Sequence, residues 1–534
     1  MGPLPAGTTP ARSLEERAGR LFPGIPALGK TPAIPVAPRD RIDRRSAVVS
    51  PWLILGCVAL YFAILLGVAW WTGRRADQAG YFLGNRRSPW YIVAFGLIGD
   101  SLSGVTYLSV PGQVGSQHCG YLQVVLGYVL GYIAIAQVLL PLYYRLNLTS
   151  IYSYLGSRFG RPAELTGAGF FLVSRVLGAA ARLYLAASVF QTFVFDPLGV
   201  PFWLTVTVIL VLILTYTWKG GIKTLVWTDS LQSGFLVLGV VLSVALLARS
   251  LDLGPMDLVR RITGSPMSQV FFWDWRAPNY FWKQFLSGAA IAVVMTGLDQ
   301  NNMQKSLSCR SLRESQRNLY SFTVIMVAVN VCFLALGVLL YEFATARGMT
   351  IPDQTDRLFP QVALGPLGPL ASLVFVLGLT AATFNSADSV LTTLTTSFCI
   401  DFLGFERRTD LTPRQQEVRR HAAHFGFAAV LLATILAFRA LNQGAVIQLV
   451  LRIAGYTYGP LLGLFALGLF TQIRLGGPAV PGVCVAAPVL CAVLSANAPR
   501  WFNGYQFGFE LLILNGLLVA GGLVLLARRS TTTA

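Results

Sequence analysis

The sequence has few charged residues for its length. Asp, Glu, Lys and Arg together make up 12% of its 534 residues, whereas soluble globular proteins carry about 25%. Hydrophobic residues make up 54% of the chain. This composition excludes an ordinary soluble enzyme and a disordered protein, and it indicates a chain solvated mostly by lipid.

Signatures of metal binding and catalysis are also missing. The seven cysteines form no Cys-x-x-Cys pair, and the three histidines are too few and too scattered for a metal site. Neither a His-Glu-x-x-His nor a Gly-x-Ser-x-Gly motif occurs. We therefore expect no enzyme activity, no cofactor and no disulfide framework.

Apolar windows dominate what is present, and thirteen of them approach or exceed the roughly 20 residues that a membrane-spanning helix needs. They cover residues 49–72, 89–113, 121–143, 166–191, 200–217, 229–250, 283–298, 320–342, 371–400, 422–441, 446–471, 477–497 and 508–528. No long polar segment separates them. The chain is therefore predicted to be one all-α polytopic domain, integral to the bacterial inner membrane and surrounded by lipid.

The basic residues behind the formal net charge of +18 are unevenly distributed among the predicted loops. On a soluble protein it would suggest a nucleic-acid partner, but basic residues gather in the loops after odd-numbered windows by about three to one. The positive-inside rule then places the N-terminus outside and the C-terminus in the cytoplasm. Residues 1–48, rich in Pro and Arg, are predicted to be a disordered extension, unless the protein starts near Val48.

Two apolar windows are interrupted by polar residues. Within 89–113 stand Asp100, Ser103, Thr106 and Tyr107 among several glycines. A broken helix frees backbone carbonyls that can bind a cation, and a carboxylate within the membrane needs a partner or a function. The short window 283–298 runs into a polar cluster that contains Asp299 and Gln300.

Window 371–400 carries a polar stripe. Ala382, Asn385, Ser386 and further hydroxyl residues recur at steps of three or four, so they share one helical face, with Asp388 beside them. Oxygen ligands of this kind suit a hard cation. A purely structural stripe remains the alternative, because Ser and Thr also bond their own backbone carbonyls.

Basic residues inside apolar windows form another group. Arg175 and Arg182 are seven residues apart and share a helical face, and Arg452 lies in 446–471. A buried arginine usually pairs with a carboxylate or a carbonyl. A carboxylate of a transported solute is the sharper alternative for Arg182 or Arg452.

The two interrupted windows run in opposite directions across the membrane. Broken helices at corresponding positions of oppositely oriented halves are the best sequence indicator of a transporter site at the midplane. We therefore predict a 5+5 inverted repeat, with five helices in 89–250 and five in 283–471. One extra helix, 49–72, precedes the repeats and two helices, 477–528, follow them.

The segment from Trp218 to Gln232 resembles a signature of the sodium:solute symporter family. It contains Gly220-Gly221, then Trp227-Thr228-Asp229 and Gln232. The resemblance extends over about residues 49–471. It implies the inverted-repeat fold shared with leucine-type transporters, and sodium-coupled import of a small organic solute by alternating access.

The resemblance also implies site residues. By position, the main sodium site would use the carbonyls of Gly99, Leu102 and Ala382 and the side chains of Asn385 and Ser386. Relatives often have two hydroxyl residues where this chain has Asn385-Ser386. Asp229, with Asp100 and Asp388, would take part in cation coupling.

Solute is expected near Ser103, Thr106, Tyr107, Asp299, Gln300 and Arg182 or Arg452. The sugar-binding Gln of some relatives has no counterpart near 451–457, and Arg452 makes an anionic or zwitterionic solute worth testing.

A proton-coupled symporter that uses Asp100, Asp229 or Asp388 is one alternative function. A membrane sensor with a symporter-like domain is another, disfavoured because the sequence ends just after its last apolar window. The solute, the sodium stoichiometry and the oligomeric state stay open.

Overall fold

The computed structural model of the protein describes residues 51–73, 78–275, 277, 279–408, 410–441, 454–473, 475, 479–503, 505 and 507–531. These residues are almost all helical, and no strand occurs among them apart from one isolated bridge between Ser88 and Cys309. The all-α prediction is confirmed. The predicted tail 1–48 lies outside the described residues.

Most of the longer helices lie in the apolar windows. The longer helices are α2 (Pro51–Gly73), α4 (Trp90–Ser101), α5 (Gly104–Gln117), α6 (Tyr121–Ala134), α9 (Arg161–Phe190), α10 (Phe202–Ser250), α11 (Pro255–Gly264), α12 (Phe281–Ala292), α14 (Leu312–Ala346), α16 (Pro369–Ser397), α17 (Pro413–Leu441), α19 (Gly459–Phe470), α20 (Ala479–Trp501) and α21 (Leu511–Thr531), of which α11 lies outside the windows. The short helices are α3 (Gln78–Leu83), α7 (Leu140–Arg145), α8 (Ser153–Phe159), α13 (Gln300–Ser306) and α15 (Leu358–Ala363).

Eight helices of the described residues are long and apolar enough to cross a membrane. Phe281–Gly297 and Gln300–Ser306 are bent by 68° relative to each other, and they add a ninth span if the pair crosses the membrane as one. The number thirteen therefore stays a prediction, in part because residues 442–453 of window 446–471 lie outside the described residues.

Both interrupted windows break where their polar residues stand. In the first, α4 ends at Ser101 and α5 begins at Gly104, because Leu102 and Ser103 have non-helical dihedral angles. In the second, α12 continues into a π-helical turn over Val293–Gly297, and Asp299 then starts α13 by accepting a hydrogen bond from the Asn301 amide at 3.0 Å. The broken helices that the sequence predicts are present.

The paired glycines of the signature form a turn between two spans. Gly221 has φ +51° inside α10 and separates Phe202–Thr217 from Gly221–Ser250. A Cβ at Gly221 would lie 2.5 Å from the Tyr81 carbonyl oxygen. Both the dihedral angle and the close approach require glycine there.

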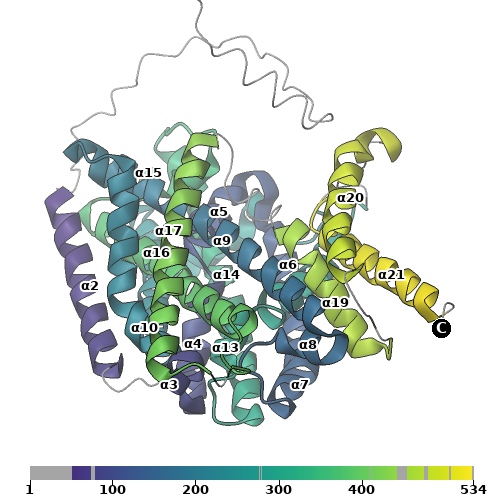
Figure 1. Cartoon of the computed structure of the whole chain (residues 1–534). Helices are drawn as coiled ribbons and strands as arrows, with labels where there is room; N and C mark the ends of the chain where they lie inside the picture. Colours follow the sequence, from purple (N-terminus) through teal and green to yellow (C-terminus); the bar gives the residue numbers. More distant parts are fainter. Residues whose placement is uncertain are drawn as a thin grey trace, which may run out of the picture.

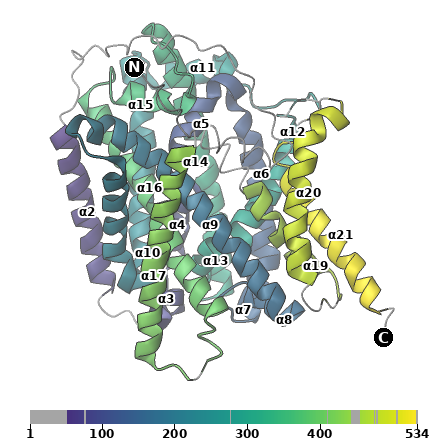
Figure 2. The same cartoon turned by 45° about the horizontal axis from the view of Figure 1, so that its top comes forward.

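Helices from the two predicted repeats are intertwined. The first broken helix, α4 and α5, packs against α14, while α12 of the second packs against α6. The extra helix α2 lies at one edge of the molecule and α20 and α21 lie at the opposite edge (Figures 1 and 2). The packed interior between these edges holds both helix breaks.

Candidate functional site

The break in the first helix presents free backbone oxygens. Because Ser103 is extended, the Gly99 carbonyl lacks the amide partner four residues on that a continuous helix provides. Within the described residues, neither the Gly99 nor the Leu102 carbonyl accepts a hydrogen bond. The break therefore supplies two oxygen ligands inside the protein.

The polar stripe of α16 lies directly against this break. A Cβ at Gly99 would be 2.4 Å from Asn385 Nδ2, and one at Gly104 would be 3.1 Å from Thr383 Oγ1. Asn385 donates from Nδ2 to the Asp229 carbonyl at 3.1 Å, and its Oδ1 is buried without a partner. Ser386 Oγ lies 3.3 Å from the Ala382 carbonyl oxygen. An orphaned amide oxygen beside free carbonyls and a hydroxyl is a donor set that fits Na⁺.

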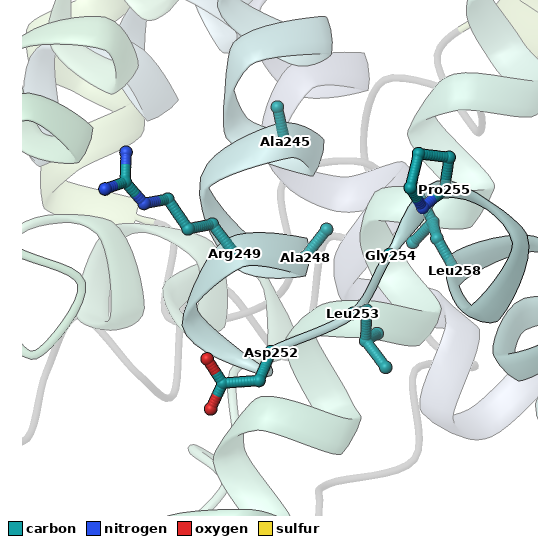
Figure 3. A pocket seen from close by; sticks show the side chains of 8 residues that line it. All are labelled: Ala245, Ala248, Arg249, Asp252, Leu253, Gly254, Pro255 and Leu258. Atoms are coloured by element: carbon teal, nitrogen blue, oxygen red, sulfur yellow. The ribbon is translucent and has the colours of Figure 1, made fainter.

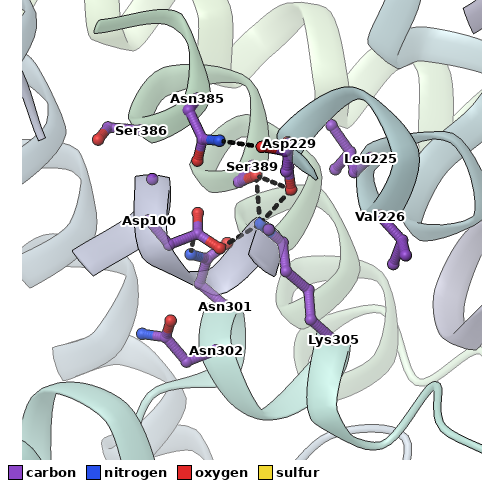
Figure 4. Close-up of polar contacts among 12 residues, drawn as sticks. Asp100, Leu225, Val226, Asp229, Asn301, Asn302, Lys305, Asn385, Ser386 and Ser389 are labelled. Carbon is purple, nitrogen blue, oxygen red and sulfur yellow. Dashed lines mark hydrogen bonds and ion pairs between the residues drawn. The ribbon is translucent and has the colours of Figure 1, made fainter. Parts of the chain in front are cut away.

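A buried ion cluster adjoins this set (Figure 4). The Lys305 ammonium of α13 forms ion pairs with Asp100 of α4 and Asp229 of α10, and it donates to Ser389 Oγ of α16 at 2.7 Å. Asn301 Nδ2 also donates to Asp100 Oδ1 at 3.2 Å. Four helices therefore meet at a single lysine.

Asp388 belongs to the same polar region but does not contact Lys305. Its carboxylate accepts from the Tyr216 hydroxyl at 2.9 Å, from Gln232 Nε2 at 3.4 Å and from the Ser389 amide at 2.6 Å. The signature residues Asp229 and Gln232 are one turn apart on α10, so both reach this centre.

A second buried ion pair joins α9 to the start of α13. Arg175 Nε donates to Asp299 Oδ2 at 2.6 Å, and its Nη2 forms an ion pair with Oδ1 at 2.5 Å. The Tyr458 hydroxyl donates to Asp299 Oδ2 at 2.9 Å. The expected carboxylate partner of Arg175 is therefore Asp299, and the charges of the two side chains balance.

A small cavity lies beside that pair. Arg182, on α9 two turns after Arg175, lines it together with Ser174, Gly178, Met295, Ala454 and Tyr458. Within the described residues Arg182 is partly buried and has no hydrogen-bond or ion-pair partner. Ala186, one turn further along α9, lies 3.6 Å from the Cβ position of Gly104. Helix α9 therefore reaches both the cavity, through Arg182, and the first helix break, through Ala186.

Most other predicted solute residues lie elsewhere. Gln300 bonds the backbone of the α7–α8 connection, with Oε1 accepting from the Ile151 amide and Nε2 donating to the Thr149 carbonyl. Tyr107 is fully buried against Phe333, Phe359 and Phe375. Ser103 is buried at the helix break, Thr106 is partly buried, and neither lines the cavity. Arg452 lies outside the described residues.

Comparison with known proteins places this arrangement in a family. The sequence profile of the sodium:solute symporter family matches residues 81–475. The chain belongs to this family. The human sodium-coupled monocarboxylate transporter 1 is 27% identical over 78% of this chain and 68% of its own length. A sodium/sialic acid symporter of Aliivibrio fischeri is 24% identical over 86% of this chain and 91% of its own length.

The fold of this symporter is shared with a solved structure. A Na⁺-coupled sialic acid symporter in a substrate-bound outward-open state superposes with a TM-score of 0.74 at 19% identity, covering 89% of this chain and 98% of that one. The protein is an integral membrane, sodium-coupled solute symporter with Na⁺ as the coupling ion, and it is a transporter rather than an enzyme. Sodium coupling is thus favoured over the proton-coupled and sensor alternatives.

Two buried polar residues were not predicted from sequence. Lys305 follows the short window 283–298, where a basic loop residue would stand, yet it is 1% exposed and paired with Asp100 and Asp229. His424 is buried in α17, where its ring contacts Thr217 Oγ1 at 2.9 Å and Thr395 Oγ1 at 3.0 Å. The spacing of the polar residues could have indicated that Lys305 is buried. Asn301 and Lys305 are about one helical turn apart, so they share one face of α13.

A larger hollow of about 550 Å³ lies away from this centre (Figure 3). It is formed between the end of α10 and the start of α11, by residues from Ala245 to Leu258. Its lining is mainly apolar, and Asp229 lies more than four helical turns earlier in α10. We therefore do not assign it to transport.

Proposed function

We propose that this symporter imports a small organic anion that carries a carboxylate, and that Arg182 binds this carboxylate. The observation that carries the proposal is the contrast between the two arginines of α9. Arg175 is neutralised by Asp299, whereas Arg182 lines the same cavity and has no hydrogen-bond or ion-pair partner among the residues that the structure describes. An unpaired guanidinium in a mostly buried site favours a planar anion that accepts two hydrogen bonds.

The names of the relatives support an anionic solute. Those compared above are named for monocarboxylates and sialic acid, and a further human relative, 26% identical over 78% of this chain, is a sodium/iodide cotransporter. Tyr458 and Ser174, which line the cavity, can donate further hydrogen bonds. Asp299, Gln300, Ser103, Thr106 and Tyr107 are not needed as direct ligands in this proposal.

The sodium site that we propose uses the carbonyls of Gly99, Leu102 and Ala382 and the side chains of Asn385 and Ser386. The buried, unpaired Asn385 Oδ1 supports it, and Asp100, Asp229 and Asp388 add negative charge nearby. Sodium here would hold the helix break against α16. Since α9 carries Arg182 and packs on Gly104 after the break, sodium and solute would favour the same closed arrangement in alternating access.

We also propose that the N-terminus is outside and the C-terminus cytoplasmic, in a bacterial cytoplasmic membrane. The ends of α7 and α8, which carry Arg145 and Arg158, lie at the same end of the molecule as the C-terminus, whereas α11 and α15 lie at the other (Figure 2). The two five-helix repeats, 89–250 and 283–471, remain the proposed division of the chain.

Replacing Arg182 by Gln is expected to lower kcat/KM for carboxylate uptake about 100-fold. Removing one partner of a buried charge pair costs about 2–5 kcal/mol. Uptake into proteoliposomes under an inward sodium gradient, with lactate, N-acetylneuraminate and lactamide as probes, measures it. The wild type should transport an acid and not the neutral amide.

Arg249→Gln is the matched control, because Arg249 is an exposed arginine at the hollow between α10 and α11, away from the proposed site. It should leave uptake unchanged. Equal uptake of acids and neutral amides by the wild type would disprove the anion proposal. So would an Arg182→Gln variant with wild-type uptake.

Replacing Ser386 by Ala is expected to raise the sodium concentration for half-maximal uptake about tenfold, because one oxygen ligand is lost. The maximal rate at saturating sodium should change little. The sodium dependence of uptake at fixed solute measures this. Ser157→Ala, in α8 outside the proposed site, is the control. A sodium dependence equal to that of the wild type would show that Ser386 is not a ligand.

A further inference from the structure

The position of Lys305 is the starting point. Lys305 is 1% exposed, and its ammonium touches oxygens from three other helices, namely Asp100 of α4, Asp229 of α10 and Ser389 of α16 (Figure 4). A buried ammonium is costly unless it is paired and hydrogen-bonded. Here all three contacts are to oxygen, two of them to carboxylates.

The same oxygens form a cage suited to a small cation. Carboxylate and hydroxyl oxygens are ligands that hard cations prefer. Asp229 has a second oxygen, Oδ1, that is buried without a hydrogen-bond partner among the described residues. The cage therefore has unused acceptor capacity beyond what the ammonium takes.

The charge balance depends on Lys305. Among the described residues, the ion pairs of Asp100 and Asp229 are made with Lys305 alone. Without the ammonium, two adjacent buried carboxylates would be left uncompensated, which is strongly unfavourable away from water. A monovalent cation in the cage would restore the same charge.

We propose that the Lys305 ammonium fills a second cation site and so limits this symporter to one bound sodium ion. The inference rests on the sodium site proposed above and deepens it by assigning a stoichiometry. The two sites are adjacent but separable. Ser386 belongs only to the first, and Ser389, one turn later on α16, belongs only to the second.

Equilibrium binding of ²²Na⁺ to the purified full-length protein in detergent tests this without a known solute. The wild type should bind about one sodium per chain. At a sodium concentration about ten times the wild-type dissociation constant, Ser386→Ala should bind only about half a sodium per chain, because the first site is about tenfold weaker and the lysine blocks the other. Lys305→Met should bind about two sodium ions there, and the double variant about 1.5.

Lys305→Arg, which keeps the positive charge, should stay at one and is the matched control. A wild type that binds two sodium ions would overturn the lysine proposal and leave the first site intact. A Lys305→Met protein that keeps the Ser386-dependent site yet binds only one would also overturn it. If Lys305→Met does not fold, the wild-type and Ser386→Ala counts still decide.

Two outcomes concern the first site instead. A wild type that binds no sodium, or a Ser386→Ala variant that keeps the single sodium of the wild type, would disprove the proposed sodium ligands. The same data therefore distinguish failure of the sodium site from failure of the lysine assignment.

Discussion

Replacing Arg175 by Met is expected to destabilise the symporter by about 3–5 kcal/mol, because Asp299 would keep a buried charge without its partner. Asp299 is 0% exposed and Arg175 5% exposed, and one hydrogen bond and a second ion-pair contact join them. Thermal unfolding of the purified protein in detergent measures the loss. Asp299→Leu should destabilise to a similar degree, since it leaves the guanidinium unpaired.

The double variant Arg175→Met/Asp299→Leu provides the decisive comparison. Replacing both partners of a buried pair by apolar groups is often close to neutral, so the double variant should be more stable than either single one. Arg261→Met, which breaks an exposed pair with Glu342, is the matched control and should not shift the unfolding temperature measurably. Additive losses in the double variant would show that the two residues act independently.

This pair illustrates what the sequence could predict at the site. The seven-residue spacing of Arg175 and Arg182 placed both on one helical face, and burial predicted a carboxylate or carbonyl partner for a buried arginine. The identity of that partner could not be predicted, because Asp299 follows 124 residues later. Contacts between distant segments depend on the packing of α9 against the bent span, and local periodicity does not encode it.

The fold could be predicted from the sequence more completely than the contacts between side chains. Hydropathy indicated a polytopic helical protein, and clustered Gly, Ser and Asp indicated a broken helix within 89–113, which the structure breaks at Leu102–Ser103. Lys305 shows the limit of charge counting. A lysine at the end of a short apolar window looks like a loop residue that sets topology, yet the 68° bend turns α13 inward and buries it. The same limit applies to His424, which the sequence places among the basic residues of a helix start.

Because Gly99 has no side chain, the broken helix can lie close to α16. Gly99→Ala is therefore expected to weaken sodium binding strongly. A Cβ there would lie 2.4 Å from Asn385 Nδ2 and 2.9 Å from Ser233 Oγ, so the helix or both side chains must move. Overpacking of this kind costs about 1–3 kcal/mol. If this cost falls on the sodium-bound state, sodium affinity drops about 5- to 150-fold.

Space and ligand chemistry can be separated at this position. Asn385→Ser shortens the side chain and keeps an oxygen ligand, so Gly99→Ala/Asn385→Ser should recover sodium affinity relative to Gly99→Ala alone. Gly67→Ala, where a Cβ meets nothing within 4 Å, is the control and should behave as wild type. Sodium-dependent thermal stabilisation, with choline as the replacement cation, measures all three variants. Because the second substitution relieves the closer of the two contacts that the new methyl would make, recovery would locate the sodium-sensitive contact between Gly99 and Asn385. Unchanged sodium affinity in Gly99→Ala would instead mean that the break and α16 need not approach each other for sodium to bind.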